Sequence, residues 1–160
     1  MARQVFFSFN YERDISRVNV VRNSGFLQTE TGFIDHSLWE ESKQKGDQAL
    51  EKLIDAGLKG ASVTAVLIGA QTAGRRWVNY EILNSWNQGK GLIGIRIHKI
   101  KNFAGATDIA GADPFANFTL NTNGGKASLS QFVDTYDWVD DDGYNNLSSW
   151  LETAAAKRGR

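Results

Sequence analysis

Segment 75–86 contains two residues, Trp77 and Glu81, whose types and spacing could serve catalysis. If the segment is a helix, Val78 and Ile82 lie at the centre of its apolar side, with Glu81 at the edge and Trp77 beyond it. Partial removal of a carboxylate from water raises its pKa and strengthens its attraction to developing positive charge. The alternative is that Glu81 is a solvated or salt-bridged surface residue, and helix position alone leaves both interpretations open.

Other candidates follow predicted strands, at the points where apolar runs end. Phe9 and Asn10 close one such run, and Asp35 and His36 close a shorter one. Ligands of open α/β sheets bind beyond the carboxyl ends of the strands, so we expect functional residues to gather there. His36 is therefore a candidate binding residue, although it could equally be an ordinary polar residue.

The rarest residue types exclude several kinds of chemistry. The chain has no cysteine, which rules out disulfides, thiolate metal sites and a cysteine nucleophile. Its two histidines, His36 and His98, lie on different predicted elements, which disfavours both a metal site and a serine triad. We therefore expect no metal, and a carboxylate is left as the leading catalytic group.

The sequence also contains no complete motif for phosphate or flavin binding in the order that such binding requires. Segment 89–94 fits G-x-G-x-x-G but lies between a helix and the following strand, the reverse of the order that phosphate binding requires. It is better explained as a helix stop and a closely packed strand glycine. Gly125-Lys126 lacks the rest of a Walker A motif. The first strand ends without the acidic residues of a receiver domain or the phosphate loop of a flavodoxin.

Overall charge narrows the range of partners. The 160 residues include 18 Lys plus Arg and 18 Asp plus Glu, so the formal net charge is zero. A neutral chain offers no general attraction to nucleic acid or to an anionic membrane. The longest apolar runs are strand-sized, far below the roughly 20 residues of a membrane helix. We expect a soluble cytoplasmic protein that binds neither nucleic acid nor membranes. Any anionic ligand must be held by a local arrangement of charges.

These residues must be positioned by an alternating series of strands and helices. Predicted strands are Val5–Phe9, Gly32–His36, Ser62–Ile68, Leu92–Ile97 and Phe132–Trp138. Predicted helices cover 11–23, about 39–58, 75–87 and a segment from about 144 onward. This order predicts an α/β fold with a doubly wound, five-stranded parallel sheet flanked by helices, similar to flavodoxin. The length favours a single domain over residues 1–160.

Residues 102–130 interrupt the regular pattern. They are rich in Gly, Ala, Asn and Asp, contain the only proline and show no clear period. We therefore predict a long irregular insertion, which could cover the ligand site or bind a partner. Within it, Asp113-Pro114-Phe115 could be a docking element or simply a turn.

Several of these segments together resemble the TIR-like proteins of the Thoeris antiphage defence system. The clearest link to TIR domains is a Trp followed four residues later by Glu, on the helix after the third predicted strand. The resemblance covers nearly the whole chain and implies a TIR-like fold. The matching segments are Val5 to Tyr11, Trp39-Glu40, Val63 to Ile68, Arg75 to Ile82, Tyr136 to Trp138 and Gly143-Tyr144.

The resemblance also implies an activity. Family enzymes cleave NAD, as substrate and not as cofactor, between nicotinamide and ribose, and Thoeris members release a cyclised ADP-ribose signal. Glu81 would be the catalytic carboxylate, holding the ribose and opposing the positive charge that forms on it. Pocket shape would decide whether an internal hydroxyl or water captures the ribose. The residues expected to bind substrate are Ser8, Phe9, Asn10, Asp35, His36 and Trp77.

Partners follow from the same resemblance. The diffusible nucleotide would activate a separate effector protein, a phage protein would act as trigger, and the loop around Asp35 to Trp39 would help to close the site across a subunit contact in a homo-oligomer. Two other functions stay open. One is a TIR-type interaction module without catalysis, and the other is a plain NAD hydrolase that releases linear ADP-ribose.

Overall fold

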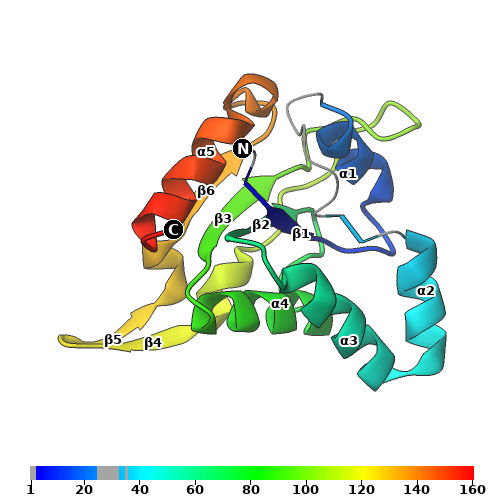
Figure 1. Cartoon of the computed structure of the whole chain (residues 1–160). Helices are drawn as coiled ribbons and strands as arrows, with labels where there is room; N and C mark the ends of the chain where they lie inside the picture. Colours follow the sequence, from blue (N-terminus) through cyan, green and yellow to red (C-terminus); the bar gives the residue numbers. More distant parts are fainter. Residues whose placement is uncertain (1–2, 25–32, 35) are drawn as a thin grey trace.

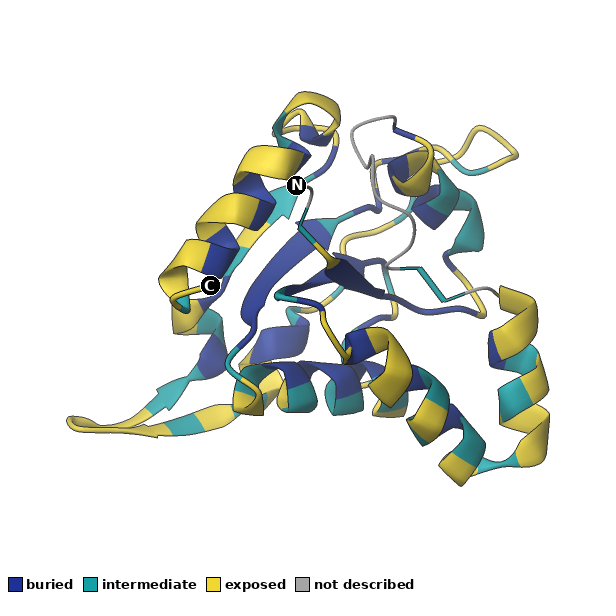
Figure 2. Ribbon diagram, viewed as in Figure 1, coloured by how far each residue is buried: buried dark blue, intermediate teal, exposed yellow. Residues whose placement is uncertain are grey.

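The computed structural model describes residues 3–24, 33–34 and 36–160, and its centre is a parallel sheet of four strands (Figure 1). The strands are β1 (Val5–Ser8), β2 (Val63–Ile68), β3 (Gly91–Arg96) and β6 (Asp134–Asp137), in the spatial order β1-β2-β3-β6. Val5 pairs with Val63, and Ile93 pairs with Asp134. The two central strands are almost entirely buried (Figure 2), which explains their continuous apolar runs. The fold is therefore the predicted α/β class with a parallel sheet.

Helices cover the two faces of this sheet. They are α1 (Ile15–Arg22), α3 (Asp47–Leu58), α4 (Arg76–Asn87) and α5 (Gly143–Lys157), whereas α2 (His36–Lys45) lies away from the sheet and packs on α3 (Figure 1). Within the residues that the structure describes, no helix is long and apolar enough to span a membrane.

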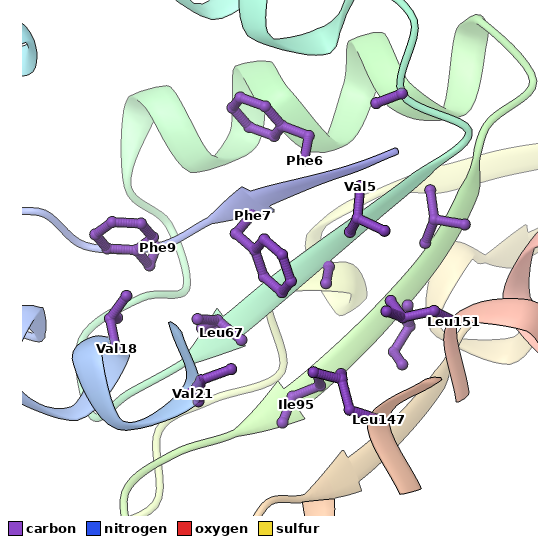
Figure 3. Close-up of a cluster of buried hydrophobic side chains, with 14 of the residues drawn as sticks. Val5, Phe6, Phe7, Phe9, Val18, Val21, Leu67, Ile95, Leu147 and Leu151 are labelled. Carbon is purple, nitrogen blue, oxygen red and sulfur yellow. The ribbon is translucent and has the colours of Figure 1, made fainter. Parts of the chain in front are cut away.

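Alternate strand residues face different helices. Phe6 and Phe7 point to opposite sides of β1 (Figure 3). Phe7 belongs to a core cluster that also includes Val21 of α1 and Leu147 of α5. On the other face of the sheet, Val66 packs in a second cluster with residues of α4. The helix that carries Glu81 is therefore fixed against the sheet by its own apolar residues.

The predicted strand at 32–36 is not part of the described sheet. Phe33 and Ile34 lie outside any strand, and His36 is instead the first residue of α2. Gly32 and Asp35 lie outside the described residues. Phe33 packs its ring on Phe7, with the ring centroids 4.0 Å apart and the planes 7° from parallel. The apolar character of this segment thus reflects packing over β1, and the described parallel sheet has four strands instead of five.

The single helix predicted from about Trp39 to Leu58 is two helices. Gly46 separates α2 from α3 and has a φ of 115°, a conformation that side chains other than glycine rarely adopt. The apolar spacing correctly identified one side of α3, where Leu50, Ile54 and Leu58 are buried. The break was missed because glycine inside an amphipathic pattern can also be tolerated without ending a helix.

The segment 102–130 contains more regular structure than predicted. It includes two short 3₁₀ helices, Pro114–Asn117 and Leu129–Phe132, and an antiparallel hairpin of β4 (Thr119–Thr122) and β5 (Gly125–Ser128) that projects from the body (Figure 1). Phe115 is fully buried beneath α4. The backbone N–H of Phe115 donates a 2.8 Å hydrogen bond to the side chain of Asp113. Asp113-Pro114-Phe115 is therefore a structural turn that places Phe115 in the second core cluster.

Two arginines after α5 cap the carboxyl end of α4. Arg158 donates hydrogen bonds to the carbonyls of Trp86 and Lys90, at 3.0 and 3.1 Å, and its guanidinium lies 3.7 Å from the centre of the Trp86 ring. Arg160 donates to the carbonyls of Gln88 and Gly89. Of these carbonyls, that of Trp86 belongs to α4 and the other three belong to the residues that lead into β3, so the two arginines hold the end of α4 and the turn after it together.

We expect Arg158→Ala to lower the free energy of unfolding by about 1–3 kcal/mol, because it removes two hydrogen bonds and a cation–π contact. Urea denaturation at pH 7 measures the change. Arg158→Lys is the matched control: it keeps the positive charge but loses the planar fork that reaches both carbonyls, so it should fall between wild type and Arg158→Ala. Equal stability of Arg158→Ala and wild type would contradict the capping role.

Candidate functional site

Glu81 lies at the carboxyl end of β1, on the side of α4 that faces the sheet. Its side chain is buried, with only 1% of the residue exposed. The Ser8 hydroxyl donates a 2.7 Å hydrogen bond to Oε1 of Glu81, whereas Oε2 makes no hydrogen bond to any described residue. The surface alternative for Glu81 is therefore wrong, and the burial is more complete than its position at the edge of the helix's apolar side predicted. The added burial comes from β1, which a helical projection does not include.

Burial changes the protonation of this carboxyl group. It raises the pKa of Glu81 to about 8, and the hydrogen bond from Ser8 opposes that shift by favouring the charged form. Most molecules therefore carry a neutral Glu81 at pH 7, and ionisation is within reach of a small rise in pH. Groups with such displaced pKa values are concentrated at functional sites.

The predicted residues at the end of the first strand gather around Glu81. Ser8 contacts it directly, and Phe9 and Asn10 are buried just beyond. Asn10 also shapes the turn that follows, because its side-chain oxygen accepts a 3.1 Å hydrogen bond from the Glu12 backbone. The structure thus brings together the β1 end and α4, as the placement of ligand sites beyond strand ends predicts.

Tyr11 is a residue of this site that the sequence-based list of candidates did not include. Its ring is buried and stacks on Trp39, with centroids 4.2 Å apart and planes 6° from parallel. It also packs on Phe9, at 4.0 Å between centroids. Burial, and then the nearby Glu81 carboxyl, raise the pKa of the Tyr11 hydroxyl far above its usual range. Its position directly after the strand end was the signal that could have identified it.

A cavity of about 340 Å³ opens beside these aromatic residues. This volume is at the lower end of the usual range for small-molecule sites. Neither Ser8 nor Glu81 is part of its lining; Glu81 lies one helical turn along α4 from the wall and is covered. The lining consists of Phe9, Asn10, Tyr11, Glu12, Trp39, Lys43, Gly74, Arg75, Arg76, Trp77 and Val78.

Trp77 and Trp39 reach this lining from two different helices. Trp77, in the first turn of α4, makes an edge contact with Tyr80 and is partly buried. Trp39 is the buried residue of α2. Trp77 therefore combines a packing role with partial exposure, which is what a stacking surface for a planar ligand requires, whereas Trp39 is 6% exposed and stacks on Tyr11.

His36 is not brought to this cavity. It is exposed on the first turn of α2, 3.6 Å from the Glu40 carboxylate, and lines a separate hollow of about 170 Å³ with Phe33 and Ile34. Phe9 borders both spaces. Asp35, the other predicted residue of this group, lies outside the described residues.

Fold and site together define a TIR-like domain: a parallel α/β sheet with Trp77 and Glu81 on the helix after β2, facing the end of β1. Comparisons with known proteins are more specific. The family model described as "Thoeris protein ThsB, TIR-like domain" matches residues 6–102. The Bacillus cereus (strain MSX-D12) protein named "Putative cyclic ADP-D-ribose synthase ThsB1" is 40% identical over an alignment 191 positions long, which covers 94% of this chain and 100% of that protein. This chain therefore belongs to the Thoeris ThsB family of TIR-like proteins.

Proposed function

We propose that this chain cleaves NAD between nicotinamide and ribose and closes the remaining ADP-ribose into a cyclic signal. The observation that carries the proposal is Glu81, a buried carboxyl group with a raised pKa, held by Ser8 beside an aromatic cavity. The name of the Bacillus cereus relative, which refers to cyclic ADP-ribose synthesis, supports the same reaction.

The proposed reaction needs little from the protein beyond charge and position. The bond from ribose C1′ to nicotinamide breaks, its electron pair leaves with nicotinamide, and the ribose becomes oxocarbenium-like. Ionised Glu81 opposes that positive charge, and the low polarity of its surroundings strengthens the interaction. A hydroxyl group in the ADP part of the same molecule then bonds to C1′ and releases its proton to solvent. Capture by water instead gives linear ADP-ribose.

Because Glu81 is only 1% exposed, this structure corresponds to a resting state in which a substrate ribose cannot reach the carboxyl group. The residues that cover Glu81 must shift before substrate binds, and Tyr11, which is near Glu81 and stacks on Trp39, forms the layer between this carboxyl group and α2. We infer that an activating event, such as a phage component or assembly into a homo-oligomer, opens this layer in the cytoplasm. The cyclic product would then act on a separate effector protein.

The direct test is to incubate the purified protein with NAD, alone and with an extract of phage-infected cells, and to follow nicotinamide release. Chromatography of the products separates cyclic from linear ADP-ribose. We expect nicotinamide and a cyclic product in the activated sample. Linear product alone would make the chain a plain hydrolase. No turnover under any trigger would favour a non-catalytic interaction module, for which the covered state of Glu81 is the supporting observation.

A further inference from the structure

A second charged arrangement lies in the same cavity, away from Glu81. The Glu12 carboxylate, in the turn after β1, is held by two cations from two other parts of the chain. Lys43 of α2 lies 2.5 Å from one carboxylate oxygen, and Arg75, directly before α4, lies 3.2 Å from the other. All three residues line the cavity.

The arrangement contributes little to folding as an ion pair. The side chains of Glu12, Lys43 and Arg75 are 47%, 49% and 42% exposed, and ion pairs at such positions are strongly screened by water. Lys43 and Arg75 lower the pKa of Glu12, so the carboxylate is fully charged at neutral pH. A stability role alone therefore does not account for two cations that converge on one point of a cavity wall.

Positive charge exceeds negative charge among the residues of this arrangement that line the cavity, which favours an anionic ligand. Two cations, Lys43 and Arg75, contact one carboxylate, Glu12, while the carboxylate of Glu40 acts on Lys43 from outside the lining. The amino end of α4 adds to the positive charge, because Arg75 provides no side-chain cap and the first turn contains no acidic residue. The guanidinium of Arg76, a third cation of the lining, pairs with Asp47 of α3 at 2.9 Å and lies 4.6 Å from the centre of the Trp77 ring. An anion with two charges would balance this site better than the single carboxylate does.

We propose that Lys43 and Arg75 bind the diphosphate of a dinucleotide and that Glu12 occupies this position in the free protein. The identity of the ligand rests on the proposed function. Arginine and lysine are the usual partners of phosphate oxygens, and Trp77 in the same cavity offers a partly exposed ring for an attached base. An arriving diphosphate has to displace Glu12, so Glu12 lowers the apparent affinity by competing with the ligand.

Binding of ADP-ribose, which carries the diphosphate but no nicotinamide, tests the proposal by titration calorimetry. We expect Arg75→Gln and Lys43→Gln each to weaken binding by about tenfold, and Glu12→Gln to tighten it by about three- to tenfold. Inorganic pyrophosphate should compete with ADP-ribose. Adenosine, which has no phosphate, should show the same affinity for all variants.

Two control variants separate this site from general charge effects. Lys45→Gln removes a cation from α2, and Glu41→Gln removes the carboxylate that pairs with it; neither residue lines the cavity. Both should bind ADP-ribose as wild type does. Circular dichroism of each variant checks that the fold is retained, because all five residues are partly exposed and their replacement should not disturb the core.

The outcomes distinguish this proposal from the proposed reaction. If ADP-ribose affinity depends on Arg75, Lys43 and Glu12 as expected but nicotinamide is never released, the diphosphate site stands and the reaction fails. If nicotinamide is released while the three variants match wild type in ADP-ribose affinity, the diphosphate site is overturned. Absence of ADP-ribose binding in both wild type and Glu12→Gln overturns it as well.

Discussion

Glu81→Gln is expected to lower kcat/KM for NAD cleavage by at least about a hundredfold, the scale of loss when one preorganised electrostatic partner of a transition state is removed. Gln retains the size of Glu81 and can still accept the hydrogen bond from Ser8, but it cannot become negatively charged. The measurement is nicotinamide release by the activated protein at several NAD concentrations. Since the charge matters only when positive charge develops, most of the loss should appear in kcat.

The fold should survive this substitution, which makes the activity result interpretable. Glu81 is mainly neutral at pH 7 because burial raises its pKa to about 8, so a neutral amide is a close replacement. Glu41→Gln, on the exposed surface of α2, is the matched control and should keep full activity. Full activity of Glu81→Gln would overturn the catalytic assignment, and another residue would have to oppose the charge on the ribose.

The second large effect concerns pH. Activity that needs ionised Glu81 should rise about tenfold per pH unit below the pKa and level off above pH about 8. The hydrogen bond from Ser8 lowers this pKa, so Ser8→Ala should move the midpoint of the profile to higher pH. The measurement is kcat/KM for NAD between pH 6 and pH 9.5. A flat profile, or an unchanged midpoint in Ser8→Ala, would contradict this role of Glu81.

Stability should change with pH in the opposite direction. The folded-state pKa of Glu81 lies above its unfolded value of 4.5, so the folded protein binds the proton more tightly. The corresponding stabilisation is fully present below pH about 4.5 and is lost as pH rises through about 8. Urea denaturation of Glu81→Gln should lack this loss. The difference from wild type identifies Glu81 as the group that titrates.

The sequence predicted well those features that depend on one segment at a time. The apolar runs identified β1, β2 and β3, the alternating pattern of residues 132–138 identified β6, and the spacing on α4 placed Glu81 at the edge of the helix's apolar side. The segment from Gly32 to His36 was wrongly predicted as a strand, because two adjacent apolar residues can belong either to a buried strand or to a loop that packs on the core. Phe33 belongs to the second kind and packs on Phe7. The hairpin at 119–128 was missed because its strands are short and mostly exposed, so they have no hydrophobic pattern.

Features of the site that depend on several segments were beyond sequence reasoning. Burial of Glu81 requires the end of β1 to pack against α4, and the stack of Tyr11 on Trp39 joins the turn after β1 to α2. Lys43 and Arg75 are 32 positions apart and have no motif that would connect them. Only their meeting on Glu12 makes them a candidate site.

The glycine between α2 and α3 also bears on how proteins of this family can diverge. Gly46 joins α3 to α2, the helix that contributes Trp39 and Lys43 to the cavity lining, and α2 has a single buried side chain, Trp39. Substitutions along α2 can therefore alter the ligands that the cavity accepts while the sheet and Glu81 stay as they are. New ligand preferences could arise on one short helix, with few of the compensating changes that a remodelled core would demand.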